Sequence, residues 1–189
     1  MTSMFWFRNK DIKENILPFI IRVRNQRRLT FKLVVSAFMS LTAAILQGAG
    51  GMVPGIGMLI SPLSTAPIII SVLLFPSYGI LSYFLTIFLL LLIQPSELIV
   101  FPFTTGAMGI GIGFGLTLFN KVWKVLSFSS LFLSIGICLL LYLLQFPVLG
   151  PFLIEFSILN IILIYLFSLI YCWIWIGTVG TVLMVFFTR

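Results

Sequence analysis

The sequence contains no histidine, two cysteines and only four acidic side chains among its 189 residues. Without a histidine base, Ser-His-Asp and Cys-His catalytic centres are excluded. Cys138 and Cys172 lie in separate apolar runs with no partner nearby, so neither a disulfide framework nor a zinc site is expected. The ATP-binding motif GxxxxGK followed by Ser or Thr is also absent. We therefore expect a protein that is not an enzyme and that holds no metal or cofactor.

Charged residues are scarce, at 8% of the chain, whereas 61% of the residues are hydrophobic and the mean hydropathy is +1.25. Soluble domains carry about 25% charged residues, so this composition indicates an integral membrane protein. A helix needs about 20 apolar residues to cross a bilayer. The chain predicts an all-α bundle of six transmembrane helices, at residues 32–48, 56–75, 79–94, 98–120, 123–145 and 155–187. The last stretch is long for one crossing, which predicts a tilt or a bend near Gly177 and Gly180.

The basic residues predict the orientation of these helices. Ten of the eleven Lys and Arg lie within residues 8–32 or 121–124, and the eleventh is Arg189. Cytoplasmic loops of membrane proteins carry an excess of such residues. With six spans, this rule places the N-terminus and the C-terminus in the cytoplasm, and Glu97 and Glu155 at the outer face. We therefore predict a multi-pass protein of the cell membrane.

The chain divides into a basic cytoplasmic or interfacial segment, residues 1–31, and a six-helix transmembrane domain, residues 32–189. The basic segment is either an amphipathic helix on the inner membrane surface or a plain topology anchor. It adjoins a span and has no element that reads nucleic acid, so membrane lipids are expected partners and nucleic acid is not.

Two spans carry small residues at helical spacing. In the first span Ser36, Ser40 and Ala44 share one face, which serves either an internal contact or an external partner. The fourth span carries two overlapping small-xxx-small faces, which predict close helix packing or sliding against a partner. Their glycines are Gly109, Gly111, Gly113 and Gly115. They do not form a dinucleotide-binding GxGxxG motif, because Phe114 and Leu116 stand where its last glycine is needed.

Polar residues gather where the third span passes into the fourth. Pro102 interrupts this region, and Glu97 is costly at membrane depth unless it has a partner or water. The second span is interrupted in a similar way by prolines and hydroxyl side chains. Interrupted helices are tolerated at depth only where they face protein or a cavity. The two regions therefore predict an outward-facing polar pocket; the alternative is a solvated Glu97 beside kinked helices. The candidate binding residues are Gln94, Ser96, Glu97, Thr104, Thr105, Ser61, Ser64 and Thr65.

The stretch SPLSTAPIIISVLLFPSYG, the small-residue face of the first span and the six-span topology together resemble the substrate-binding S-component of energy-coupling factor (ECF) vitamin transporters. The resemblance covers residues 30–189. It implies a bundle of six helices with both ends inside. It also implies a substrate in the outer half, covered by the outer loops GAGGMVPG and QPSE and lined by later helices. The first-helix face, here Ser36, Ser40 and Ala44, would dock onto a membrane scaffold subunit driven by two cytoplasmic ATPases.

The function implied by this resemblance is a solute-binding subunit of an ATP-driven uptake transporter. A pocket with so little charge favours a small vitamin-like ligand that is cationic, neutral or amphiphilic. The alternative is a membrane interaction, assembly or lipid-handling protein without transport of its own. A scaffold subunit with two ATPases among co-purified proteins would indicate transport, and a single dedicated partner or lipid alone would indicate the alternative.

Overall fold

The computed structural model describes residues 24–25, 28–53, 55–150 and 156–187, with side chains up to residue 181. Its described part is helical and contains no strand. Six helical stretches are long and apolar enough to cross a membrane. They are Leu29–Met52, Ile56–Leu74, Pro76–Ile93, Glu97–Leu118, Val122–Leu143 and Ile158–Thr181. The prediction of an all-α, multi-pass membrane protein with six spans is therefore confirmed, while the orientation of its ends stays a prediction.

Three of the spans are single helices over their whole length. The first span is α3 (Leu29–Met52), the third is α6 (Pro76–Ile93), and the sixth is α10 (Ile158–Phe187). The sixth span is one continuous helix that passes through Gly177 and Gly180. The tilt or bend expected for this span stays a prediction. Glu155, which the sequence places at the outer face, lies outside the described residues.

The second, fourth and fifth spans change helix type along their length. The second runs from α4 (Ile56–Ile60) through the 3₁₀ turn η2 (Ser61–Ser64) into α5 (Thr65–Leu74). Pro62, at the start of η2, cannot donate a backbone hydrogen bond, which favours a short turn there.

The fourth span breaks between α7 (Glu97–Phe103) and α8 (Thr105–Leu118), two residues after Pro102. Thr104, between the two helices, has non-helical dihedral angles of −117° and −95°. The fifth span, α9 (Val122–Cys138), ends in the π-helical turn η3 (Leu139–Leu143).

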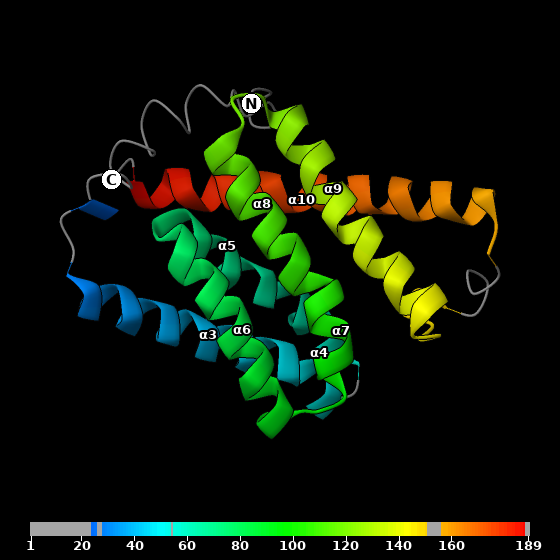
Figure 1. The fold of residues 1–189 in the computed structure, drawn as a ribbon, viewed down its shortest axis with the longest axis horizontal. Coiled ribbons are helices and arrows are strands. Elements are labelled where there is room, and N and C mark those ends of the chain that lie inside the picture. Colours follow the sequence, from blue (N-terminus) through cyan, green and yellow to red (C-terminus); the bar gives the residue numbers. More distant parts are fainter. Residues whose placement is uncertain (1–23, 26–27, 54, 151–155, 188–189) are drawn as a thin grey trace.

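Helix α8 lies inside the bundle, with α5 on one side and α9 on the other (Figure 1). The glycines of α8 allow both neighbouring helices, α5 and α9, to pack closely against it. A Cβ built on Gly113 would lie 2.6 Å from Val72 Cβ of α5, and one on Gly115 would lie 2.9 Å from Val125 Cγ1 of α9. Gly109 faces Ile68 of α5 in the same way, and Gly111 faces Ser129 of α9. Each of the two glycine faces is thus occupied by a different helix of the same chain.

The small-residue face of α3 packs against α6. Ser36, Ser40 and Ala44 are buried, and the Ser40 and Ser82 hydroxyl oxygens lie 2.9 Å apart. The Thr86 hydroxyl donates to the Ser40 carbonyl oxygen at 3.3 Å. Of the two roles that the sequence leaves open for this face, the structure shows the internal contact. A scaffold subunit could use the same face only if α3 and α6 separated.

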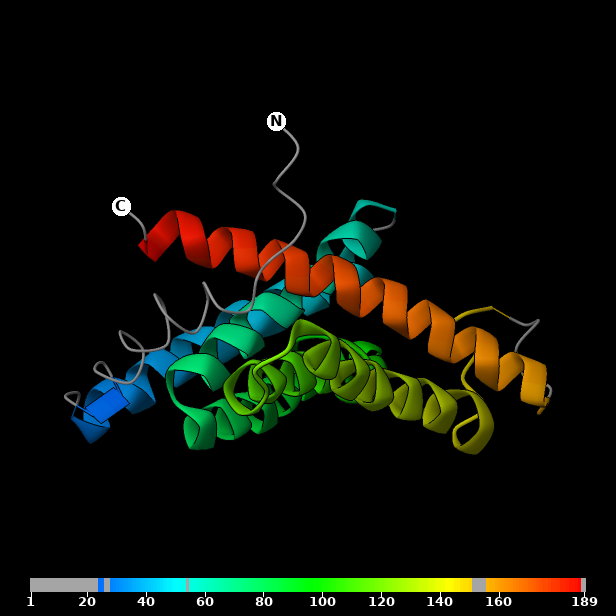
Figure 2. The same ribbon diagram turned by 90° about the horizontal axis from the view of Figure 1, so that it is seen from above.

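Helix α10 crosses one side of the bundle and packs mainly on α9 (Figure 2). The buried residues of α5, α8, α9 and α10 form one apolar core, and those of α3, α5, α6 and α7 form a second. Helix α5 belongs to both cores, so it links the two parts of the molecule.

Arg24, in the N-terminal basic segment, contacts the bundle. The Arg24 guanidinium donates from Nη2 to the Leu73 carbonyl oxygen at 3.0 Å and from Nε to that of Leu74 at 3.3 Å. These carbonyls end α5, where a positive charge favourably faces the negative end of the helix dipole. Partial burial lowers the pKa of Arg24. Residues 1–23 and 26–27 of this segment lie outside the described residues, so the amphipathic helix and the topology anchor both remain predictions.

Candidate functional site

The side chain of Gln47, on α3, is the centre of a buried polar junction. Its carbonyl oxygen Oε1 accepts hydrogen bonds from the Ser64 hydroxyl at 2.7 Å and from the Thr105 hydroxyl at 2.8 Å. Its amide nitrogen Nε2 donates to Oε2 of Glu97 at 2.7 Å. Gln47 is 1% exposed, and Ser64 and Thr105 are also buried. One amide thus joins the first, second and fourth spans.

The local structure explains why these groups meet. Gln47 lies three residues beyond Ala44, so it continues the face of α3 that packs into the bundle. Ser64 ends the 3₁₀ turn η2, and Thr105 begins α8. Both hydroxyls therefore stand where a span is interrupted, and Gln47 bridges the two interruptions. Helix α8 starts there, so its positive dipole end lies beside the Gln47 oxygen.

Glu97 is half-buried at the first residue of α7. One carboxylate oxygen, Oε2, is held by Gln47. The other, Oε1, would lie 2.9 Å from a Cβ added to Gly50, and Ser61 Cβ would lie 3.1 Å from that same added atom. The missing side chain at Gly50 therefore leaves the space in which the carboxylate sits. Among the described residues, Oε1 accepts no hydrogen bond, so it is the free acceptor of the junction.

The structure brings together four of the eight candidate binding residues. Ser64, Thr105 and Glu97 meet at Gln47, and Ser61 lies beside Glu97 at Gly50.

The other four candidates lie apart from Gln47 or do not bond to it. Gln94 donates to the Ser96 hydroxyl at 3.0 Å, near the surface. Thr104 donates to the Val100 carbonyl oxygen of its own span at 2.8 Å. The Thr65 hydroxyl is buried and has no hydrogen-bond partner in the described part of the chain.

Gln47 is absent from the candidates that sequence reasoning gave, although it is the residue that connects them. The sequence does carry a signal for it: Gln47 is the one amide side chain between Leu29 and Met52, and it lies on the small-residue face. A primary amide buried in a membrane span needs hydrogen-bond partners, because lipid supplies none. That requirement, applied to the first span, would have pointed to this residue.

Neighbouring helices cover the break in the fourth span. The Tyr83 hydroxyl of α6 donates to the Pro102 carbonyl oxygen at 3.1 Å. Gly136 of α9 lies against the Phe103 carbonyl oxygen, where any side chain would collide with it. The irregular backbone is therefore enclosed by protein, the condition under which a membrane tolerates it.

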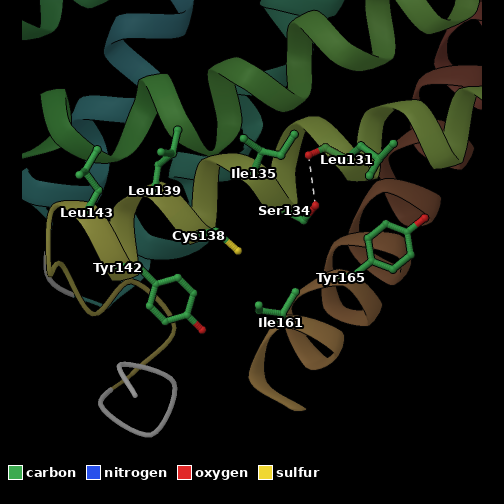
Figure 3. A pocket seen from close by; sticks show the side chains of 9 residues that line it. All are labelled: Leu131, Ser134, Ile135, Cys138, Leu139, Tyr142, Leu143, Ile161 and Tyr165. Atoms are coloured by element: carbon green, nitrogen blue, oxygen red, sulfur yellow. Dashed lines mark hydrogen bonds between the residues drawn. The ribbon is translucent and has the colours of Figure 1, made fainter. Parts of the chain in front are cut away.

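A second candidate site lies between α9 and α10. It is a cavity of about 520 Å³ lined mostly by aliphatic side chains, with one serine, one cysteine and two tyrosines (Figure 3). None of the described residues in this lining is charged. The Tyr142 hydroxyl, in this lining, is buried and has no hydrogen-bond partner among the residues described.

Within the described residues, no group of three or more His, Cys, Asp or Glu side chains is placed to hold a metal ion. The chain was also compared with known proteins. No protein-family model, no curated protein and no solved structure matches it.

Proposed function

We propose that this protein is the solute-binding subunit of an ATP-driven uptake transporter in the cell membrane, with its energy supplied by partner subunits. The observation that supports this most is the meeting of two interrupted spans at Gln47 and Glu97. In membrane transporters, pairs of interrupted helices form substrate sites, because their ends present polar groups inside the bilayer.

The chemistry of the junction favours a ligand with a positive or hydrogen-donating group. Gln47 Oε1 already accepts two hydrogen bonds, so it has no capacity left for a ligand. Glu97 Oε1 accepts none from the described residues, and Glu97 is half-exposed, so a ligand reaches this oxygen first. With Glu97 as the one acid of the junction, a small vitamin-like or amphiphilic ligand fits better than a strongly anionic one.

A scaffold subunit would bind a different surface from the one that the resemblance implies. Since Ser36, Ser40 and Ala44 face α6, a scaffold subunit with two ATPases would contact another surface. The opposite face of α3 is one such surface, because Val34, Phe38 and Ile45 are each more than half exposed. The alternative function is a membrane assembly or lipid-handling protein without transport of its own.

Native mass spectrometry of the protein purified from its own membranes tests the proposal. We expect a bound small molecule, and co-purification of a scaffold subunit with two ATPases. Glu97→Gln keeps an oxygen for Gln47 and removes the charge. A unit charge at 4 Å contributes about 4 kcal/mol at an effective dielectric constant near 20, so ligand affinity should fall by about tenfold or more.

Ser96→Ala is the matched control, because it changes a neighbouring exposed side chain without touching the junction. It should leave ligand binding unchanged. If Glu97→Gln binds as well as the parent, Glu97 is a structural residue and the junction is not a ligand site. Co-purification of one dedicated partner, or of lipid alone, would favour the alternative function.

A further inference from the structure

The cavity between α9 and α10 has two walls of different origin. One wall comes from α9 and the π turn η3, and the other from Ile161 and Tyr165 of α10 (Figure 3). Its volume of about 520 Å³ lies within the range of small-molecule sites, about 300–1,000 Å³. The cavity shares no lining residue with the Gln47 junction, so an inference about it does not depend on the proposed transport function.

The π turn determines how Tyr142 is presented. The Leu144 amide donates to the Leu139 carbonyl oxygen at 3.0 Å, five residues back, so the helix is widened here. The Tyr142 ring packs edge-on against Phe156, with ring centroids 5.2 Å apart. Single π turns are rare and are frequent at functional sites, because they redirect side chains that a regular helix would place elsewhere.

Among the described lining residues, the Tyr142 hydroxyl is the one hydroxyl group that both points into the cavity and lacks a partner. Ser134 bonds to the Leu131 carbonyl oxygen of its own helix at 3.1 Å. Figure 3 shows the Tyr142 hydroxyl directed toward the space between the helices, while that of Tyr165 points away from it. A buried hydroxyl without a partner is destabilising, unlike that of Tyr83, which donates to the Pro102 carbonyl oxygen.

We propose that this cavity binds a neutral amphiphile, with an apolar body between α9 and α10 and one hydroxyl or carbonyl group paired with Tyr142. None of the described lining residues could pair with an ionic head, so an uncharged head fits these walls better. Leu131, Ile135 and Leu143 of the lining are 49%, 58% and 73% exposed on a span that faces lipid, so the ligand enters sideways from the bilayer. A plain acyl chain would fill the space but would leave the hydroxyl unpaired.

Retinol, an apolar polyene with one hydroxyl group, is a suitable fluorescent probe. Its binding to the full chain in phosphatidylcholine nanodiscs should be saturable. Tyr142→Phe should weaken retinol binding by about 3- to 10-fold, the effect expected of one lost hydrogen bond. The same variant should bind the deoxy hydrocarbon with the same skeleton as well as the parent does. Tyr165→Phe is the matched control and should leave the affinity for both probes unchanged.

Cys138→Trp adds bulk on the cavity wall, and it should abolish binding of both probes. Its thermal unfolding would show whether it folds, and Tyr142→Phe tests the proposal independently of that outcome. Equal retinol binding by Tyr142→Phe and the parent would overturn the proposal. An equal loss of affinity for the hydrocarbon would overturn it too, as would binding that does not saturate, because the space would then hold ordinary lipid.

Discussion

The Gln47 junction and the α9–α10 cavity differ in whether their buried polar groups are hydrogen-bonded. At the junction, Gln47 engages Ser64, Thr105 and Glu97, so three spans are fixed to one another. In the cavity, the buried Tyr142 hydroxyl has no partner in the described structure. A buried polar group left unpaired costs about 1–3 kcal/mol. The comparison indicates that the hydrogen bonds of Gln47 hold the spans together, while Glu97 Oε1 remains available to a ligand. The Tyr142 hydroxyl, in contrast, does not stabilise the fold.

The packing of the glycines differs between α8 and α10. Gly109 and Gly113 of α8 leave no room for a Cβ beside α5, so these helices touch closely. Gly177 of α10 has nothing within 4 Å of an added Cβ. Gly177 therefore faces open space, although Trp175, Ile176 and Val179 beside it on α10 are buried in the core.

Gly113→Leu should have the largest effect on stability. The new side chain would be forced into Val72, whose Cβ lies 2.6 Å from the position of the first added atom. Overpacking of this kind costs typically 1–3 kcal/mol and more where the backbone must move, so we expect a loss of about 3 kcal/mol. Thermal unfolding in detergent measures it. Gly177→Leu is the control and should change stability little; equal losses in the two variants would show that the bundle is no tighter at α8 than at α10.

Gln47→Leu should have the next largest effect. It keeps a side chain of similar size and leaves the Ser64 and Thr105 hydroxyls and the Glu97 carboxylate without their partner. The hydroxyls can turn to carbonyl oxygens of their own helices, and Glu97 can reach water, so we expect a loss of about 2 kcal/mol.

Gln94→Leu is the matched control for Gln47→Leu, because the Gln94 amide bonds only to Ser96 near the surface. It should cost less than about 0.5 kcal/mol in the same unfolding measurement. A Gln47→Leu protein as stable as the parent would mean that the junction does not hold the spans together.

The spans were predictable from the sequence because hydropathy and length decide which segments cross a bilayer. The break in the fourth span was also foreseeable, since Pro102 cannot complete the helix. The hydrogen-bond partners of the polar residues could not be predicted, because each hydroxyl of the candidate set has several possible acceptors. Only the packing of α3 on η2 and α7, with the start of α8 beside them, selects Gln47 as the common partner.

The cavity had no signal in the sequence. The π turn has the sequence LLLYL, which is as compatible with a regular helix as with a widened one. Nothing in the sequence around Tyr142 distinguishes it from other residues of a membrane span. The position of α10, which forms the second wall, depends on packing contacts far apart in the chain.

Tyr142→Phe should have the smallest effect on stability. It tests most directly whether the cavity differs from the junction in the pairing of its buried polar groups. It removes one hydroxyl that has no partner in the described structure and leaves the ring against Phe156. Without added ligand, unfolding should therefore be unchanged within about 0.5 kcal/mol, or slightly harder, because an unpaired buried group is removed. Tyr83→Phe makes the same chemical change where the hydroxyl does have a partner, the Pro102 carbonyl oxygen, and should cost about 1 kcal/mol. If Tyr142→Phe costs as much as Tyr83→Phe, then the Tyr142 hydroxyl is bonded within the protein, and the contrast between an assembled junction and an open site fails.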